Sequence, residues 1–209
     1  PDPEGPVIAI EPPFAISNET LSSILNVPDG PSTSRTSLLA LNMTFFKSCI
    51  LGLGIWIVSF GANGNQPIIL VLGDSLSAAY QMPEDAGWVH LAQQDFGSRL
   101  KFINASVSGE TTAGAKQSLP RLLERYQPSL VIIEMGANDG LRGHAPPAIK
   151  SNLSTMIQAG LSNGAAIALI EMDIPANYGS AYRDAFRSIY RELSDQFDII
   201  LIPSIFDEI

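Results

Sequence analysis

The chain has 209 residues, 45% of them hydrophobic, and a formal net charge of −9 at neutral pH. This length accommodates one domain with appendages, and a folded part of about 150 residues buries enough surface to be stable without cross-links. The negative charge repels phosphate backbones and the sequence has no run of Lys or Arg, so we expect no nucleic-acid partner. One Cys and two His residues exclude a disulfide framework and the zinc clusters that Cys or His residues form, and we expect no metal.

Two N-terminal segments differ in composition from the rest of the chain. Residues 1–42 hold seven of the fifteen prolines without sustained apolar periodicity, which is typical of a disordered or non-native extension. Residues 43–61 begin with a short basic start at Met43, continue through an apolar run and end on small residues, the pattern of a signal peptide. The run is shorter than the roughly 18 to 20 residues that span a bilayer, so an uncleaved anchor and a buried helix are the weaker alternatives. We therefore expect a periplasmic or secreted protein with no stable membrane insertion after cleavage.

Residues 62–209 alternate short apolar runs with segments of helical periodicity, and we expect them to form one domain. This alternation is typical of a parallel sheet with helices on both faces, and it predicts an α/β fold. Strands are expected at 68–72, 101–104, 130–134, 166–171 and 199–202, and helices at 88–99, 113–126, 148–163 and 181–196.

Three loops that follow expected strands carry residues suited to chemistry. Ser75 follows the first strand, where the next helix is expected to begin, so its hydroxyl would lie over the positive end of that helix. Gly109 follows the second strand and can bring a bare backbone N–H close to a ligand. Asn138 follows the third strand and places an amide at the same edge of the sheet. A hydroxyl nucleophile, an accessible N–H and an amide are the parts of an acyl-transfer site.

Each of these residues also has a simpler structural interpretation. Ser75 could be a helix N-cap, Gly109 a turn glycine, and Asn138 the first residue of an Asx-turn. Asp74 and Asp139 are expected to be hydrogen-bonding loop residues rather than catalytic acids. Because the three motifs follow three successive strands, their joint occurrence favours the functional interpretation.

The motifs resemble those of a known enzyme family. Gly73-Asp74-Ser75-Leu76, Gly109 and Gly136-Ala137-Asn138-Asp139 look like the first three blocks of the GDSL, or SGNH, hydrolases. The longer run 73–80, with 138–143 and 175–179, is similar to the bacterial periplasmic thioesterase I, lysophospholipase L1 and arylesterase branch. The resemblance implies a flavodoxin-like three-layer α/β/α fold, the SGNH hydrolase fold. It also implies a serine hydrolase that acts without a cofactor on a small acyl ester or thioester substrate, and we expect a monomer.

The resemblance also assigns roles to individual residues. Ser75 would be the nucleophile. The oxyanion hole would consist of the Ser75 and Gly109 backbone N–H groups and the Asn138 side chain. Asn177 and Tyr178 would line the acyl pocket, although a plain turn explains them nearly as well.

The sequence departs from the family at the general base, which the family supplies from an Asp-x-x-His segment near its C-terminus. No such segment occurs in the 209 residues, so we expect a C-terminally truncated domain. His144, in the loop after the third strand, is the alternative base, and His90 is a weaker candidate. Three functions follow: a serine esterase or thioesterase, a catalytically incompetent fragment or acyl-lipid-binding module without a base, and a carbohydrate O-acetyl esterase of the same superfamily.

A second serine lies in a motif associated with hydrolases. Residues 160–164 read Gly-Leu-Ser-Asn-Gly, which satisfies the G-x-S-x-G pattern of α/β-hydrolases. That pattern must follow a strand and open a helix, whereas Ser162 is expected to end a helix and precede a strand. We therefore do not expect Ser162 to be a nucleophile.

Overall fold

The computed structural model of the chain describes residues 66–204. The predicted extension at 1–42 and the predicted signal peptide at 43–61 lie outside these residues and stay predictions. Within residues 66–204, no helix is both long and apolar enough to cross a membrane. The described part also contains no group of three or more His, Cys, Asp or Glu side chains that could hold a metal ion.

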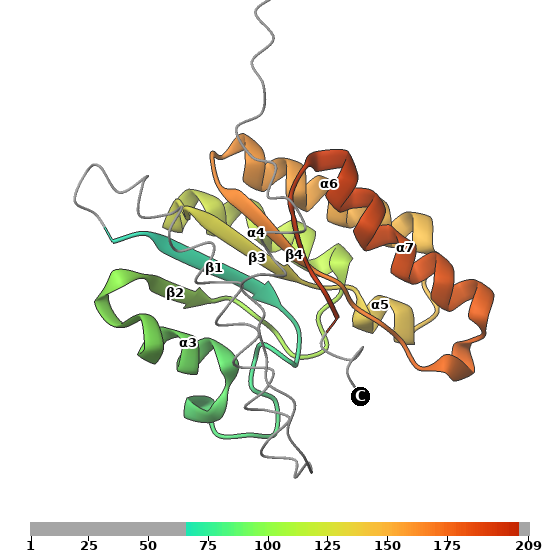
Figure 1. The fold of residues 1–209 in the computed structure, drawn as a ribbon, viewed down its shortest axis with the longest axis horizontal. Helices are drawn as coiled ribbons and strands as arrows, with labels where there is room; N and C mark the ends of the chain where they lie inside the picture. The colour runs from blue at the N-terminus through green and yellow to red at the C-terminus, as the bar shows by residue number, and fades with distance from the viewer. Residues whose placement is uncertain (1–65, 205–209) are drawn as a thin grey trace, which may run out of the picture. The chain divides into compact units, whose positions relative to one another are not determined.

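The centre of the fold is a sheet of five parallel strands in the order β2-β1-β3-β4-β5 (Figure 1). The strands are β1 (Ile68–Gly73), β2 (Lys101–Asn104), β3 (Leu130–Glu134), β4 (Ala166–Ile170) and β5 (Ile200–Ile202). This arrangement confirms the expected α/β fold with a parallel sheet. Its strand order reverses direction between β1 and β3, and ligands bind at such a point outside the carboxyl ends of the strands.

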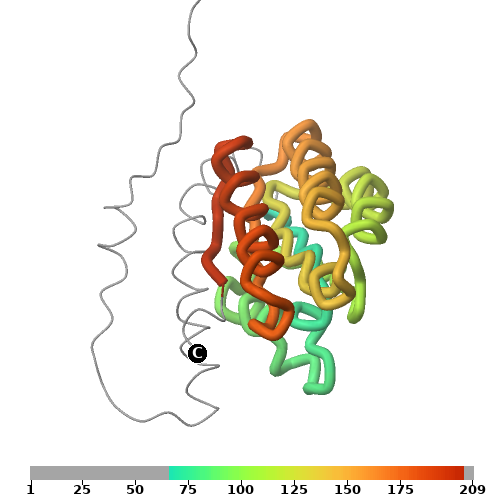
Figure 2. The backbone as a smooth tube through the Cα atoms, turned by 90° about the vertical axis from the view of Figure 1, so that its right-hand side faces the viewer, coloured from blue at the N-terminus to red at the C-terminus, as the bar shows by residue number. Residues whose placement is uncertain are grey.

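Helices connect the strands and cover the sheet. They are α3 (Trp88–Phe96), α4 (Thr112–Tyr126), the short α5 (Ala137–Leu141), α6 (Pro146–Ser162) and α7 (Ser180–Phe197). α4, α6 and α7 lie side by side as one layer (Figure 2). Because strand crossovers are right-handed and the β1-to-β2 step runs opposite to the others, α3 lies on the other face of the sheet.

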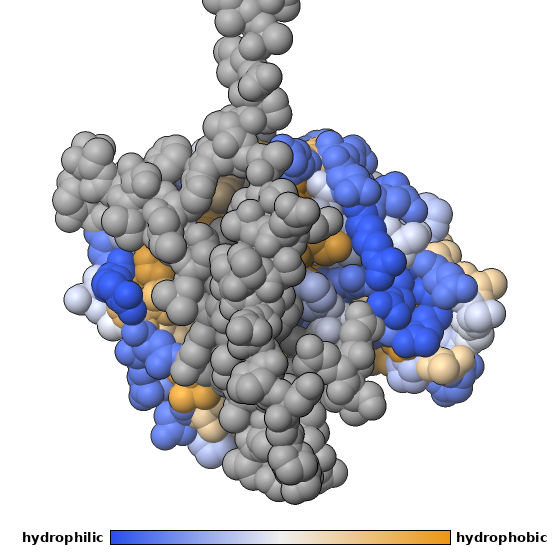
Figure 3. Space-filling model, in the orientation of Figure 1, coloured by the Kyte–Doolittle hydropathy of each residue, from blue (hydrophilic) through white to orange (hydrophobic). Residues whose placement is uncertain are grey.

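The core consists of the three inner strands, β1, β3 and β4, and the helix faces against them. The side chains of 69–72 and 130–133 are almost completely buried, which explains why both strands are continuous apolar runs. The predicted apolar stripe of α6 (Ile149, Leu153, Met156 and Ile157) is fully buried as well. The outer side of α7 is hydrophilic (Figure 3). Two arginines of α7 form ion pairs with the buried Glu171, which directly follows β4: Arg187 at 3.3 Å and Arg191 at 3.2 Å.

The structure corrects two expectations next to the predicted site. Ser75 does not open a helix: residues 75–81 form turns, and the next α-helix along the chain begins at Trp88. Ala79 and Gln81 take left-handed φ angles of 55° and 59°, which a right-handed helix does not accommodate. Isolated turns form instead: the Ala78 N–H donates to the Asp74 carbonyl at 3.0 Å, and the Tyr80 N–H donates to the Ser75 carbonyl at 3.1 Å.

The second correction concerns the loop after β3, where Asn138 lies in the short helix α5 rather than in an irregular loop. α5 follows Gly136, whose φ of 120° only glycine adopts readily, and a Cβ there would lie 2.3 Å from the Tyr190 hydroxyl. The Tyr190 hydroxyl donates to the Met135 carbonyl at 3.0 Å, so α7 holds the start of this turn.

Candidate active site

The turn after β1 and helix α5 meet at the carboxyl edge of the sheet. Asp74 is buried, and its Oδ2 accepts a hydrogen bond from Asn138 Nδ2 at 2.9 Å. Its Oδ1 accepts from the Leu76 N–H at 3.1 Å, which fixes the turn that carries Ser75. The expectation that Asp74 is a hydrogen-bonding loop residue is confirmed. An amide nitrogen carries two N–H groups, so Asn138 can bind Asp74 with one and a substrate oxygen with the other.

The loop that contains Gly109 joins the same edge through two contacts. The Val107 N–H donates to the Gly73 carbonyl at 3.0 Å, which ties the loop to the end of β1. Arg142, which follows α5, donates from Nη2 to the Gly109 carbonyl at 3.1 Å. Gly109 has a φ of 77°, a conformation that side chains disfavour, and its backbone is exposed. The structure therefore brings the loops of Ser75, Gly109 and Asn138 to one edge.

The sequence motifs did not predict a role for Glu134, a buried acid next to the turn that carries Ser75. Glu134 ends β3, and its Oε2 accepts hydrogen bonds from Ser77 Oγ at 2.8 Å and from the Asp74 N–H at 3.2 Å. Trp88 Nε1 donates to Ser77 Oγ at 3.0 Å and extends this chain of contacts to α3. Burial, and then the negative charge of Asp74, raise the pKa of Glu134 to about 8. The signal in the sequence that could have identified Glu134 is its position: it is the acidic last residue of an otherwise apolar strand.

Gly73 leaves room for this buried acid. It lies opposite Glu134 in the register of β1 and β3. A Cβ at Gly73 would lie 2.6 Å from Glu134 Oε2 and 2.8 Å from Ser77 Oγ, closer than side chains approach. The glycine before Asp74 is therefore required by the close approach of Glu134 and Ser77.

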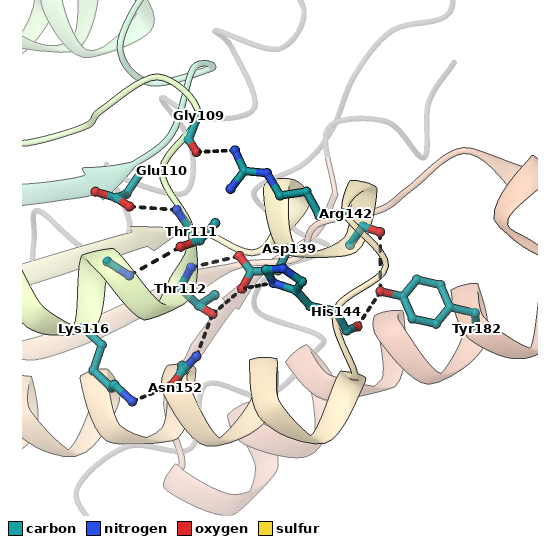
Figure 4. Close-up of polar contacts among 12 residues, drawn as sticks. Gly109, Glu110, Thr111, Thr112, Lys116, Asp139, Arg142, His144, Asn152 and Tyr182 are labelled. Atoms are coloured by element: carbon teal, nitrogen blue, oxygen red, sulfur yellow. Dashed lines mark hydrogen bonds and ion pairs between the residues drawn. The ribbon is translucent and has the colours of Figure 1, made fainter.

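Asp139 connects α5 to the two helices behind it (Figure 4). Its carboxylate accepts from the Thr112 N–H at 2.8 Å and from Thr112 Oγ1 at 2.7 Å, at the start of α4. Asn152 of α6 donates to Thr112 Oγ1 at 3.1 Å, and Lys116 donates to Asn152 at 2.6 Å. Because Gly109 lies just before α4 and Asn138 lies in α5, the Asp139–Thr112 pair sets the spacing of these two residues.

We expect Asp139→Asn to lower the free energy of unfolding by about 1 to 3 kcal/mol, because an amide offers one acceptor oxygen to two Thr112 donors. The measurement is urea-induced unfolding followed by circular dichroism. Asp184→Asn, an exposed change on α7, is the matched control and should stay within about 0.5 kcal/mol of the parent. Equal stability of the two variants would contradict a structural role for the Asp139–Thr112 pair.

His144 belongs to the Asp139 cluster rather than to the Ser75 turn. Its Nδ1 lies 3.4 Å from Asp139 Oδ1, and its carbonyl accepts from the Tyr182 hydroxyl at 2.7 Å (Figure 4). The ring is about half exposed, at 47%. Within residues 66–204, no hydrogen bond or ion pair joins His144 to Ser75. In the described part of the chain His144 thus contacts Asp139 and Tyr182, and its role as the alternative base stays a prediction.

The other candidates, His90, Asn177 and Tyr178, are exposed. His90 is exposed on α3 and pairs with Gln94 at 2.9 Å. Asn177 and Tyr178 are exposed in the short helical turn η3 (Ala176–Tyr178), where the Tyr178 hydroxyl donates to the Leu141 carbonyl at 2.9 Å. Tyr178 thus lies against α5 at the carboxyl edge.

Ser162 is the last residue of α6 and precedes β4, so it lies at the amino edge of the sheet. This placement confirms the expected context of the G-x-S-x-G motif. The serine ends a helix, whereas the nucleophile of that motif must follow a strand and open one.

The fold and the edge residues are those of a hydrolase of the SGNH class. Esterase AlinE4, described as an SGNH-hydrolase family esterase, superimposes with a TM-score of 0.65 at 33% identity, over 70% of this chain and 80% of that chain. The sequence profile of the GDSL-like lipase/acylhydrolase family matches residues 71–208. The chain belongs to this family and is a carboxylic ester hydrolase of the GDSL type.

Characterised relatives are similar over most of their length. An arylesterase of Vibrio mimicus is 42% identical over 157 residues, which cover 74% of this chain and 78% of the relative. Thioesterase 1/protease 1/lysophospholipase L1 of Escherichia coli K12 is 40% identical over 141 residues, 68% of each chain. The crystal structure of the psychrotrophic esterase EstA from Pseudoalteromonas gives a TM-score of 0.65 at 42% identity, over 67% of this chain and 79% of EstA.

Proposed function

We propose that this hydrolase cleaves acyl esters and thioesters through an acyl-enzyme on Ser75. The supporting observation is the 2.9 Å hydrogen bond from Asn138 to Asp74, because it fixes an amide donor beside the turn that presents the Ser75 hydroxyl. The Ser75 N–H, the Gly109 N–H and the Asn138 side chain are the proposed donors to the oxyanion. Relatives named as an arylesterase and as a thioesterase and lysophospholipase support aryl esters, acyl thioesters and lysophospholipids as the substrate classes.

The proposed reaction has two steps. Ser75 Oγ attacks the acyl carbon and gives its proton to a general base, a role that the family resemblance assigns to the His of an Asp-x-x-His segment. The carbonyl electron pair moves to the oxygen, which the three donors stabilise, and returns as the bond to the alcohol or thiol breaks. The leaving group takes the proton. Water then attacks the acyl-enzyme in the same way and releases the acid and the free Ser75 hydroxyl.

Exposed apolar side chains around the carboxyl edge support an acyl chain as the recognised part of the substrate. Leu76, Val107, Leu141 and Tyr178 are each 37% to 54% exposed. They lie on the segments that follow β1, β2, β3 and β4, so each of these connections contributes at least one apolar residue. A rim of this kind favours a longer acyl group over the polar ring of an acetylated sugar.

The test compares octanoyl, butyryl and acetyl esters of one chromogenic alcohol with an acetylated sugar, using the protein expressed from its complete reading frame. We expect the octanoyl ester to be preferred. Faster hydrolysis of the acetylated sugar would contradict this proposal and favour the O-acetyl esterase alternative. A folded protein that binds octanoate but hydrolyses none of the esters would instead favour the acyl-lipid-binding module.

Val107→Asn should lower kcat/KM for the octanoyl ester about tenfold relative to the acetyl ester, because a polar residue replaces one apolar contact to the chain. Leu161→Asn is the matched control, since Leu161 is a similarly exposed apolar residue, at 39%, near the amino edge of the sheet. We expect this control to leave the ratio of the two rates unchanged. An equal effect of both variants would contradict acyl recognition at the rim.

A further inference from the structure

The carboxyl group of Glu134 is only half satisfied by hydrogen bonds. Oε2 accepts from Ser77 and from the Asp74 N–H, whereas Oε1 is buried and has no hydrogen-bond partner among the described residues. Buried polar atoms in folded proteins almost always have a partner. An oxygen that carries a proton is a donor and can find its partner in a nearby acceptor.

The acceptor next to Glu134 is the carboxylate of Asp74. The two residues are neighbours, because Glu134 Oε2 accepts from the Asp74 N–H at 3.2 Å and the charge of Asp74 acts on Glu134. Each Asp74 oxygen accepts one hydrogen bond, from the Leu76 N–H or from Asn138, and therefore has a lone pair left. Asp74 can take a third donor without losing the first two.

The charge of Asp74 beside Glu134 favours a proton on one of the two carboxyl groups. Asp74 from the β1 turn is the charge that acts directly on Glu134. Asp139 from α5, Glu171 after β4 and the phenol of Tyr190 from α7 are further acids of the same interior. The basic groups that face them are His144 beside Asp139, and Arg187 and Arg191 beside Glu171. Two adjacent buried carboxylates repel each other strongly, so one of them holds a proton.

We propose that Glu134 is a positioning residue: its Oε1–H donates to the Asp74 carboxylate and thereby fixes the orientation in which Asp74 holds Asn138. The proposal rests on the oxyanion role of Asn138 given above. The proton stays covalently on Glu134, and the Asp74 side chain accepts from three donors. Removal of the proton creates two adjacent buried charges, which repel and loosen the Asp74–Asn138 bond.

The direction of the pH effect follows from burial and from the charge of Asp74, which raise the pKa of Glu134 from 4.5 to about 8. The folded protein therefore holds this proton more tightly than the unfolded chain. The stabilisation is fully present below pH 4.5 and is lost as the pH rises toward about 8. The positioning effect persists through neutral pH and disappears above this midpoint.

The experiment follows two nitrogen-bound protons by NMR while the pH is raised. The indole N–H of Trp88 senses Glu134 through Ser77, and the side-chain amide of Asn138 senses it through Asp74. The two signals are identified by their loss in Trp88→Phe and Asn138→Ala. We expect both signals to shift with one common midpoint near 8. Glu134→Gln, a neutral carboxamide of the same shape, should abolish both shifts, whereas Glu124→Gln on the exposed side of α4 should leave them.

Three results would overturn the proposal. A midpoint below about 5 would show an ordinary ionised glutamate. A shift of Trp88 without one of Asn138 would show that the proton does not reach the oxyanion residue. Shifts that survive in folded Glu134→Gln would assign the titration to another group. If Glu134→Gln does not fold, Asp74→Asn replaces it and should lower the midpoint seen at Trp88, because it removes the neighbouring charge. The readout needs no turnover, so its failure is distinguishable from a failure of Ser75 as nucleophile.

Discussion

Ser75→Ala is expected to lower kcat for acyl-ester hydrolysis by a factor of about 10³ to 10⁶, because it removes the atom that forms the acyl-enzyme. The oxyanion donors and substrate binding remain and account for the residual rate. Ser75 is only partly buried and makes no side-chain contact within residues 66–204 that the fold requires, so the variant should fold normally. Steady-state kinetics with a chromogenic butyryl ester, beside circular dichroism, measures the effect.

Two further variants test whether the loss of activity is specific to Ser75 and whether His144 is the general base. Ser162→Ala, in the G-x-S-x-G motif at the amino edge, is the matched control and should leave kcat unchanged. His144→Ala tests the alternative base, and the 3.4 Å approach of His144 to Asp139 rather than to Ser75 leads us to expect a small effect. A loss in Ser162→Ala equal to that in Ser75→Ala would refute the assignment of the nucleophile. A similar loss in His144→Ala would make His144 the base.

Asn138→Ala should lower kcat by a factor of about 10² to 10³ with little change in KM, because an oxyanion donor acts mainly in the transition state. The variant also removes the donor to Asp74 Oδ2, so we expect a loss of about 1 to 3 kcal/mol in the free energy of unfolding. Kinetics below the unfolding temperature of each variant separate the two effects. Asn163→Ala, at the end of α6 near the amino edge, is the control for replacing an asparagine.

Two outcomes would contradict the oxyanion role of Asn138. A change in KM alone would mean that Asn138 binds the substrate and its transition state equally. An unchanged kcat would leave Asn138 with the purely structural contact to Asp74. Either result would remove the observation on which the proposed oxyanion hole depends.

The central strands were predictable because burial on both faces leaves a local signature. β1 and β3 read as unbroken apolar runs in which almost every side chain is buried. The grouping of Ser75, Gly109 and Asn138 followed from one rule, since the carboxyl ends of parallel strands share an edge. Neither inference required a contact between residues distant in the sequence.

The contacts that position these residues could not be predicted because they join segments far apart. Glu134 and the Asp74 N–H are 60 positions apart, and Asp139 and Thr112 are 27 apart. No local pattern pairs an acid with one particular donor at such distances. The turn after Ser75 was missed for a different reason: Ala79 and Gln81 adopt left-handed backbone angles without the glycine or asparagine that normally signals them.

The most direct test of the account is to react the protein with a chromophore-tagged alkyl phosphonate fluoride and to locate the adduct by peptide mass spectrometry. Such a reagent phosphonylates an activated serine with loss of fluoride, so the product records which hydroxyl is the nucleophile. We expect one adduct, on Ser75, and no labelling of Ser75→Ala. An adduct on Ser162 or any other residue, or equal labelling of Ser75→Ala, would contradict it.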